Sequence, residues 1–287
     1  MPQTPSIDIS GNSGCSVRLV RQSQRIAVEK SSQQPSYIPR LKTQIKKQQA
    51  FNNRIDDSRI CIPKLYEEIE DGAYYSALME FLPYLNFIDF LSSCSAPALF
   101  QSIEIINNFI CQNTGKASIT INRPALAKLD EIEHKVTDSQ PKTQIFQCSS
   151  MKLKRYFEHK EITLRAGPCH GDFTLSNLVF SATGDCVGLF DFLDSYIDSP
   201  VIDLLKLRQD SQLHWSFLKA RKTSSHIRIY QGLKKLDLFA QRKLSKLGVS
   251  EDAYRALQAV NLLRILPYAN EPETLNFIQS SLKNMEI

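Results

Sequence analysis

The sequence has no long apolar run, no paired cysteine motif and no apolar leader. No segment approaches the roughly 18 consecutive apolar residues of a membrane-spanning helix, so we expect no membrane span. The seven cysteines are scattered without a C-x-x-C pair. This pattern predicts neither a zinc site nor a disulfide framework, and it favours reduced thiols in the cytoplasm. The opening Met-Pro-Gln-Thr-Pro-Ser has no basic or apolar region, so we expect no secretory signal.

Strong charge of either sign is also missing. The net charge is +5, and charged residues make up 23% of the 287-residue chain. A charge this small suits anionic small molecules but is too weak to indicate nucleic-acid binding. The hydrophobic fraction of 42% supports a sizeable core, and the length allows two lobes or domains.

The most informative segment runs from His170 to Asp194. It begins His-Gly-Asp-Phe-Thr-Leu-Ser-Asn and ends Asp-Phe-Leu-Asp. Two apolar runs between these motifs, 178–180 and 187–190, flank the turn signal Gly184-Asp185 and therefore predict a β-hairpin. Such a hairpin brings Asn177 near Asp191, with a second carboxylate, Asp172, close by in the sequence.

These residue types suit phosphoryl transfer from a nucleotide to a hydroxyl. Magnesium prefers oxygen ligands, and it commonly takes one or two protein carboxylates together with substrate phosphates. Asp191 and Asn177 could fill that role. Asp172 could orient the acceptor hydroxyl and accept its proton. We interpret His170 as a structural brace for the loop rather than as an acid or base.

The pattern H-G-D-x-x-x-x-N followed by D-F-x-D resembles the aminoglycoside phosphotransferase and choline kinase group of small-molecule kinases, relatives of the protein kinases. The match is specific from about Pro168 to Leu207. The resemblance implies Asp172 as catalytic base and Asn177 and Asp191 as metal ligands. Asp194 becomes a candidate for a second metal or a supporting contact. Asp203 is expected to tie the following helix to the catalytic loop.

The N-terminal region supplies a candidate phosphate-binding lysine. A glycine-containing turn at 10–14 precedes the alternating runs 16–20 and 25–30, which predict a second hairpin. Ile26, Val28 and Lys30 share one face of its second strand. In the resembling family, the first turn would cover the nucleotide phosphates and Lys30 would hold them.

The next helix departs from the kinase pattern. Residues 40–53 have helical spacing but contain no glutamate to fix the lysine. Gln44 is the nearest polar substitute and could accept a hydrogen bond from Lys30. Alternatively, Lys30 is held differently or the alignment is shifted. The lysines of this helix are interpreted as a solvated face; they are Lys42, Lys46 and Lys47.

An interrupted edge strand at 60–66 and an acidic turn at 67–72 are expected before a strand at 74–82. The end of that strand would be a hinge, where backbone groups around Glu80 and Leu82 would hydrogen-bond an adenine. Met79 would lie behind the base or simply in the core. Beyond residue 87, the spacing predicts mainly helices, at 96–114, after Pro200, and in blocks from 211 to the C-terminal region.

Together these features predict an α+β, two-lobed, protein-kinase-like fold. The small lobe, 1–83, would hold an antiparallel sheet and one helix and bind the nucleotide. The larger, mainly helical lobe, 84–287, would hold the catalytic hairpin and the acceptor.

The predicted activity is magnesium-dependent transfer of the γ-phosphate of ATP or GTP to a hydroxyl of a small metabolite. Basic residues follow Leu207, so a neutral or anionic acceptor such as a sugar or sugar acid is favoured; they are Lys219, Arg221, Lys222, Lys234, Lys235, Arg242 and Lys243. The pair His214-Trp215 could contact an acceptor or lie in the core. The alternative is a catalytically silent nucleotide-binding regulator, motivated by the missing glutamate. A protein kinase is disfavoured because the segment between Asp194 and Pro200 is too short for an activation segment.

Overall fold

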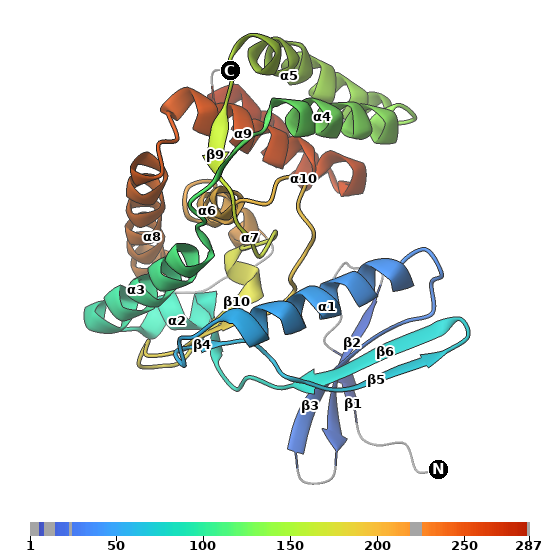
Figure 1. Cartoon of the computed structure of the whole chain (residues 1–287), viewed down its shortest axis with the longest axis vertical. Helices are drawn as coiled ribbons and strands as arrows, with labels where there is room; N and C mark the ends of the chain where they lie inside the picture. Colours follow the sequence, from blue (N-terminus) through green and yellow to red (C-terminus); the bar gives the residue numbers. More distant parts are fainter. Residues whose placement is uncertain (1–5, 9–14, 23–24, 219–225, 286–287) are drawn as a thin grey trace. The chain divides into compact units, whose positions relative to one another are not determined.

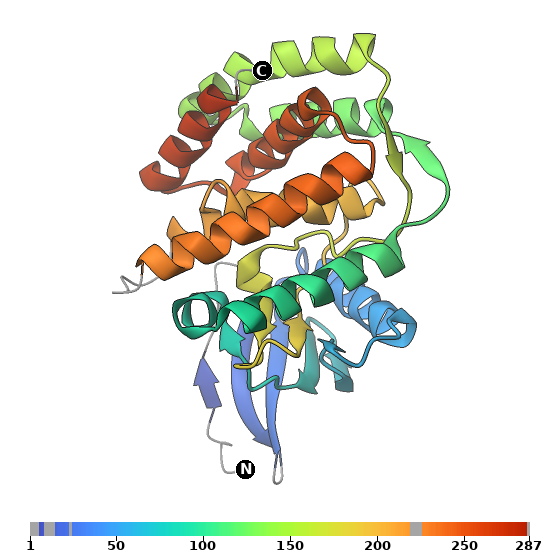
Figure 2. The ribbon, with the colours of Figure 1, turned by 90° about the vertical axis from the view of Figure 1, so that its left-hand side faces the viewer.

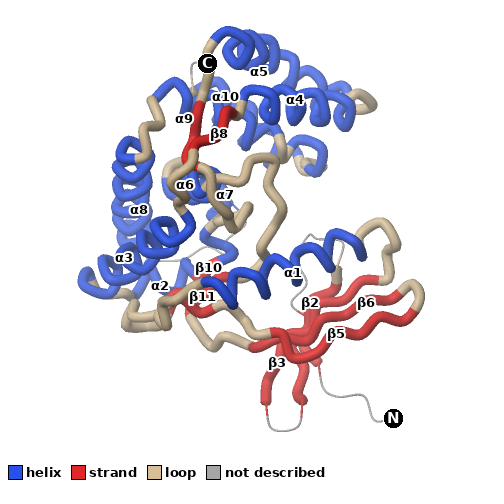
Figure 3. Tube along the Cα trace, viewed as in Figure 1, coloured by secondary structure: helices blue, strands red, loops and turns tan. Residues whose placement is uncertain are grey.

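The computed structural model describes residues 6–8, 15–22, 25–218 and 226–285. They form two compact units. The N-terminal unit holds 1–109 and 175–194, and the C-terminal unit holds 110–174 and 195–287. The predicted lobes, 1–83 and 84–287, divide the chain at a different point from these units. Apart from the pair β8 (Ser118–Thr120) and β9 (Thr163–Arg165), the strands belong to the N-terminal unit (Figure 3).

A five-stranded antiparallel sheet forms the centre of the N-terminal unit, in the order β1-β2-β3-β6-β5. Its strands are β1 (Ser6–Asp8), β2 (Ser16–Gln22), β3 (Arg25–Ser32), β5 (Leu65–Asp71) and β6 (Tyr74–Glu80). The predicted β2–β3 hairpin is confirmed. The predicted glycine turn at 10–14 lies outside the described residues.

The acidic turn expected at 67–72 is wrong, because most of this segment belongs to β5. All six residues after Leu65 in this strand are exposed, and β5 is the sheet edge. Charged side chains are stable on an edge strand because they remain solvated, and they also discourage pairing with another chain. The turn itself narrows to the region of Gly72, whose φ is +56°.

Helix α1 (Ile38–Arg54) confirms the predicted helix and lies along one face of this sheet (Figure 1). Leu41 and Ile45 of α1 pack with Tyr75, Ala77 and Met79 of β6 in one buried cluster. Met79 is therefore a core residue of the N-terminal unit. The period of 3.6 on the helix and of 2 on the strand explains why alternate β6 residues meet one helix face.

The hairpin predicted at 178–190 is confirmed. Strands β10 (Leu178–Phe180) and β11 (Val187–Leu189) pair antiparallel, within a small sheet of order β4-β11-β10-β7. The outer strands are β4 (Ile60–Cys61) and β7 (Leu85–Asn86). Gly184 occupies the turn at φ +74°, where a β-carbon would stand 2.1 Å from the Ala98 carbonyl oxygen. Only glycine fits this position without strain.

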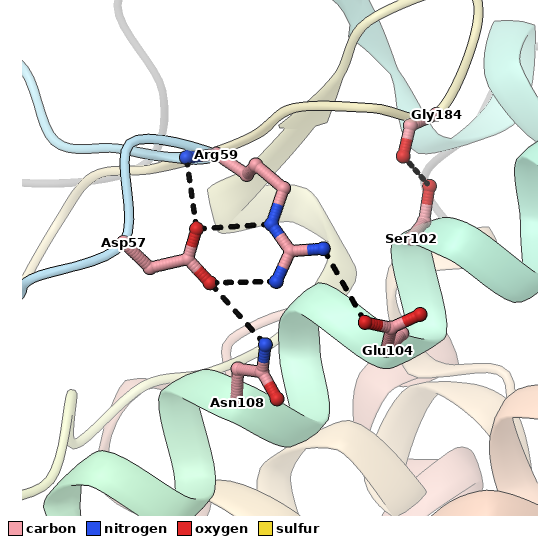
Figure 4. A network of polar contacts seen from close by, with 6 residues as sticks. All are labelled: Asp57, Arg59, Ser102, Glu104, Asn108 and Gly184. Carbon is pink, nitrogen blue, oxygen red and sulfur yellow. Dashed lines mark hydrogen bonds and ion pairs between the residues drawn. The ribbon is translucent and has the colours of Figure 1, made fainter.

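Helices α2 (Phe87–Ser93) and α3 (Ala96–Asn113) follow β7. A polar network joins the segment before β4 to α3 (Figure 4). Arg59 donates to Asp57 at 2.9 and 3.0 Å and to Glu104 at 3.3 Å, and Asn108 donates to Asp57 at 3.3 Å. The Arg59 hydrogen bonds lower the pKa of Asp57 to about 2. On the same helix, Ser102 donates to the Gly184 carbonyl, which fixes the hairpin turn.

The described C-terminal unit is mainly helical, as predicted. Its helices are α4 (Asn122–Val136), α5 (Gln140–His159), α6 (Pro200–Ser211), α7 (Trp215–Leu218), α8 (His226–Lys246), α9 (Glu251–Leu263) and α10 (Pro272–Asn284). Short 3-10 turns occur at Leu175–Asn177 in the N-terminal unit and at Leu266–Tyr268 in this one.

Helix α6 is the buried centre of the C-terminal unit. All twelve of its residues are buried, and α8 and α9 pack against it (Figure 2). Ser199 caps its N-terminus by accepting from the Val201 N–H, and Pro200 takes the first helical position, where no N–H is needed. Several buried residues of α6 are polar or charged, so each needs a partner inside the unit.

No helix in the described part of the chain is long and apolar enough to cross a bilayer. All seven cysteines lie in that part, and none forms a disulfide.

Candidate active site

Lys30 and Asp191 meet in the N-terminal unit. Lys30 lies in the middle of β3, paired with Val17 of β2 and Ala77 of β6. Its ammonium group forms an ion pair with the Asp191 carboxylate, although the two residues are 161 positions apart. The Lys30 side chain is 11% exposed and that of Asp191 is 37% exposed. Burial lowers the pKa of Lys30 to about 8, and the charge of Cys15 opposes this shift.

Asn177 borders Asp191 through the hairpin. Leu178 pairs with Leu189, and the Asn177 carbonyl accepts a 3.3 Å hydrogen bond from the Phe190 N–H. Asn177 therefore stands opposite the residue that immediately precedes Asp191. Asp191 has φ +63°, an uncommon left-handed conformation for a residue other than glycine. Backbone of this kind costs of order 1–3 kcal/mol and is often found at functional sites.

The next residue explains how this conformation is held. Phe192 is fully buried, and its ring centroid lies 4.8 Å from that of Phe51 on α1. A second tie comes from Lys47, whose ammonium group donates to the Leu193 carbonyl at 2.5 Å. Lys47 is half-buried, so the interpretation of all three α1 lysines as a solvated face is wrong for this residue. The segment that follows Asp191 is thus attached to α1 by packing and by a hydrogen bond.

The donor atoms around Asp191 fit magnesium better than a transition metal. Asp191 could supply carboxylate oxygens and Asn177 an amide oxygen, which are hard ligands. Among the residues that the structure describes, there is no group of three or more His, Cys, Asp or Glu side chains that could hold a metal. Magnesium does not need such a cage, because it keeps several waters and shares substrate phosphates.

Asp172 belongs to the C-terminal unit, where α6 holds its loop. The two carboxylate oxygens of Asp203 accept the N–H groups of His170 and Gly171, at 2.8 and 2.9 Å. Gly171 has φ +87°, a conformation that glycine adopts without strain. This arrangement confirms the predicted tie between Asp203 and the catalytic loop.

His170 also lies within this loop and is fully buried. Its Nδ1 accepts a 3.3 Å hydrogen bond from the Asp172 N–H, and its ring packs edge-on against Phe173 at 5.6 Å. These contacts agree with a bracing role. They also leave the Asp172 side chain, 26% exposed, at the end of a rigid turn.

The sequence interpretation missed Lys206. Its Nζ lies 3.2 Å from Asp172 Oδ1 and 3.4 Å from Gln209 Oε1, and its side chain is 9% exposed. Burial lowers the pKa of Lys206, and the Asp172 charge opposes the shift. The available signal was its spacing: Lys206 follows Asp203 by three positions, so both lie on the same side of one helix.

Gln44 and Asp194 are two further residues that the sequence predicts for the site. Gln44 is buried on α1, while the Lys30 ammonium group pairs with Asp191. Its replacement of the helix glutamate stays a prediction. Asp194 is exposed, and its role as a second metal ligand also stays a prediction.

The predicted hinge follows β6. The Glu80 N–H donates to the Lys64 carbonyl at 2.8 Å, and the Leu82 carbonyl accepts the Tyr84 N–H at 2.9 Å. These two groups are already engaged within the protein. An adenine would therefore have to use the Glu80 carbonyl and the Leu82 N–H, which stays a prediction.

Residues 115–236 match the family model of the phosphotransferase enzyme family. No curated protein matches the sequence. Among solved structures, the chain is similar to a thermostable mutant of aminoglycoside phosphotransferase APH(4)-Ia in ternary complex with AMP-PNP and hygromycin B. The identity is 12%, the coverage is 98% of this chain and 92% of that chain, and the TM-score is 0.64.

Two further solved structures have the same fold. A protein described as a fructosamine-3-kinase from Haemophilus somnus 129PT is 10% identical, with coverage of 98% and 90% and a TM-score of 0.59. The streptomycin–ATP ternary complex of APH(2″)-IIa is 12% identical, with coverage of 97% and 91% and a TM-score of 0.57.

The family match and the shared fold confirm the predicted resemblance and the predicted protein-kinase-like α+β fold. Residues 115–236 carry the match to the phosphotransferase enzyme family, and the chain shares the fold of solved aminoglycoside phosphotransferases.

Proposed function

We propose that the protein transfers the γ-phosphate of a nucleoside triphosphate, ATP or GTP, to a hydroxyl group of a small metabolite. The observation that carries the proposal is the ion pair between Lys30 and Asp191. One residue was expected to bind phosphates and the other to bind a metal, and they come from distant parts of the chain. Their meeting supports a common site for a metal and the nucleotide phosphates.

Asp172 is the proposed catalytic base. The acceptor hydroxyl must lose its proton as the phosphoryl group transfers, and a positioned carboxylate can orient the hydroxyl and accept that proton. Asp203 and His170 support this role by fixing the turn that carries Asp172. Lys206 supports it by pairing with the carboxylate, which favours the deprotonated form.

Asp191 and Asn177 are proposed to hold Mg²⁺. When bound, the ion neutralises phosphate oxygens that would otherwise repel the acceptor. Lys30 would then exchange its contact with Asp191 for a contact with the phosphates. A buried lysine is suited to this role because its charge is poorly solvated and gains from an anionic partner.

The proposed acceptor is a sugar or a sugar derivative. Solved relatives of this fold hold hygromycin B or streptomycin, or are described as a fructosamine kinase. The basic residues of α8 favour a neutral or anionic compound over a polycation; they are Lys234, Lys235, Arg242 and Lys243. The other three predicted basic residues, Lys219, Arg221 and Lys222, lie outside the described residues. The cytoplasm is the proposed location, since it supplies the nucleotide and keeps cysteines reduced.

A screen of hydroxyl compounds coupled to nucleotide consumption, with purified protein and magnesium, tests this function. Transfer should depend on an acceptor and on magnesium. Asp172→Asn and Asp191→Ala should abolish it while the proteins remain folded by circular dichroism. Turnover by Asp191→Ala at the wild-type rate with an identified acceptor would overturn the proposal.

The second candidate is a silent nucleotide-binding regulator. It is favoured by the absence of any acidic residue within α1. A thermal-shift titration with ATP, with and without magnesium, measures binding. Magnesium-dependent stabilisation without transfer to any acceptor would support the regulator, whereas acceptor-dependent transfer would exclude it.

A further inference from the structure

A polar interface between α6 and α9 lies next to the proposed base. Lys206 of α6 contacts Asp172, and it also approaches Gln209 Oε1, which accepts a 2.8 Å hydrogen bond from Asn261 Nδ2 of α9. Arg264 follows α9 at its C-cap, and its positive charge contributes to the lowered pKa of Lys206. Asp172 is thus flanked on this side by Lys206, with Arg264 nearby.

The guanidinium group of Arg264 has unused hydrogen-bonding capacity. Its carbon lies 5.1 Å from the ring centroid of Tyr196, a cation–π contact. Its Nη1 is buried without a hydrogen-bond partner, and among the described residues no carboxylate forms an ion pair with it. The Tyr196 hydroxyl is also buried without a partner. Buried polar groups are normally satisfied, so this pair calls for a polar occupant or water.

The same interface contains further unsatisfied polar atoms. Asn261 Oδ1 and both amide atoms of Gln258 are buried without a partner. The nearby acids, by contrast, are engaged: Asp172 pairs with Lys206, Asp210 accepts from the Ser216 N–H and Oγ at 2.8 and 2.9 Å, and Asp237 pairs with Arg208. Within the described part of this interface, Arg264 is therefore the cation without a carboxylate partner.

The surplus of positive charge beside Asp172 determines which acceptor charge the site tolerates. A cationic amino sugar would bring a third positive charge towards Lys206 and Arg264 in a poorly solvated region, where like charges repel more strongly than in water. An anionic oxygen group would instead find a planar guanidinium able to donate two parallel hydrogen bonds. Hydroxyl groups could pair with the Tyr196 hydroxyl and the free amide atoms.

We propose that Arg264 is a specificity residue that selects an acceptor bearing an anionic oxygen group, a carboxylate or a phosphate, in addition to its reacting hydroxyl. The proposal rests on the proposed kinase function, because it assumes that the acceptor approaches Asp172. The acceptor class is thereby narrowed from a neutral or anionic sugar derivative to a sugar acid or sugar phosphate.

The test measures binding and transfer with four probes of one carbon skeleton. They are D-gluconate, D-glucose 6-phosphate, D-glucitol and D-glucosamine, each titrated calorimetrically into the full chain in the presence of ADP and magnesium. The variants are Arg264→Gln, which removes the charge, and Arg264→Lys, which keeps the charge but loses the planar fork. The matched control is Arg255→Gln, since the Arg255 side chain on α9 is 43% exposed and pairs with Glu251.

We expect gluconate or glucose 6-phosphate to bind at least tenfold more tightly than glucitol and glucosamine. The tighter binder of these two probes shows whether the site prefers a carboxylate or a phosphate. Arg264→Gln should weaken binding of the anionic probe at least tenfold, and Arg264→Lys should weaken its binding less. Arg255→Gln should leave the affinity for this probe unchanged. In transfer assays the loss should appear in KM for the acceptor and leave KM for the nucleotide unchanged.

The proposal is overturned if glucitol or glucosamine binds as tightly as the anionic probes, if neither anionic probe binds, or if Arg264→Gln leaves their binding unchanged. The last result would assign Arg264 a purely structural role. Failure of the kinase function gives a different result. In that case, magnesium–ADP binding would be absent or insensitive to Asp191→Ala, whatever the acceptor probes do.

Discussion

Replacing Asp203 with asparagine tests whether α6 holds the catalytic loop. Asp203 is fully buried, and its two oxygens accept the N–H groups of His170 and Gly171. Asparagine keeps one acceptor oxygen, so the other N–H would face an NH₂ group. Because a hydrogen bond to a charged acceptor contributes about 1.5–3 kcal/mol, we expect the free energy of unfolding to fall by about 2–3 kcal/mol. Most domains have a free energy of unfolding of about 5–15 kcal/mol, so the protein should remain folded.

The effect on the rate should be larger than the effect on stability. A shift of about 1 Å in a catalytic group can cost about 100-fold in rate. We therefore expect kcat to fall about 100-fold for Asp203→Asn, because the turn that carries Asp172 loses one of its two anchors. Nucleotide affinity should not change, because Lys30 and Asp191 belong to the other compact unit.

Urea unfolding followed by tryptophan fluorescence measures the stability change. The single tryptophan, Trp215, lies in the same unit as Asp203 and packs on Phe277. The control is Asp198→Asn, an exposed acid near the loop, for which we expect a change within about 0.5 kcal/mol. A wild-type kcat together with a stability loss below about 1 kcal/mol would refute the anchoring role of Asp203.

Two further predictions concern pH and the hairpin turn. The unfolded chain holds the Lys30 proton up to about pH 10.5 and the folded chain only to about 8. The free energy of unfolding should therefore rise between these values, by about 3 kcal/mol, in wild type but not in Lys30→Met. Over the same pH range the KM of the wild-type protein for the nucleotide should increase, because Lys30 loses its charge. Equal pH profiles of the free energy of unfolding in wild type and Lys30→Met would contradict this prediction. Gly184→Ala should destabilise the protein by more than about 2 kcal/mol, since the new methyl group would meet the Ala98 carbonyl. Gly72 also has a positive φ, but a β-carbon there would meet no atom within 4 Å, so Gly72→Ala should lower the free energy of unfolding by only about 1–2 kcal/mol. Equal losses for the two variants in urea unfolding would exclude the predicted clash with the Ala98 carbonyl.

The sequence predicted the elements whose signals are local. The hairpin β10–β11 followed from two apolar runs around Gly184, and α1 followed from its helical spacing. The strand β5 was missed because its exposed glutamates imitate a turn, and only its pairing with β6 makes it a strand. The pair β8–β9 was missed because each strand has three residues, too few to show a period.

The same distinction applies to the site. Asp172, Asn177 and Asp191 were proposed as site residues because they lie within one short motif, and their roles stay predictions. The Lys30–Asp191 pair spans 161 positions, so the residues alone could not predict it, and only the resemblance linked its two members. Lys206 was missed because its burial and its contact with Asp172 depend on tertiary packing.

Transfer of a labelled γ-phosphate tests the central claim most directly. Wild type, Asp172→Asn, Asp191→Ala and the hairpin control Asp185→Asn would be compared with magnesium and an acceptor identified in the screen. Asp185 is an exposed turn residue that bonds Ser181 and Thr183, so its variant should keep most activity. The account predicts labelled acceptor from wild type and the control, and none from the other two folded variants. Labelled acceptor formed by Asp172→Asn or Asp191→Ala at the wild-type rate would contradict it.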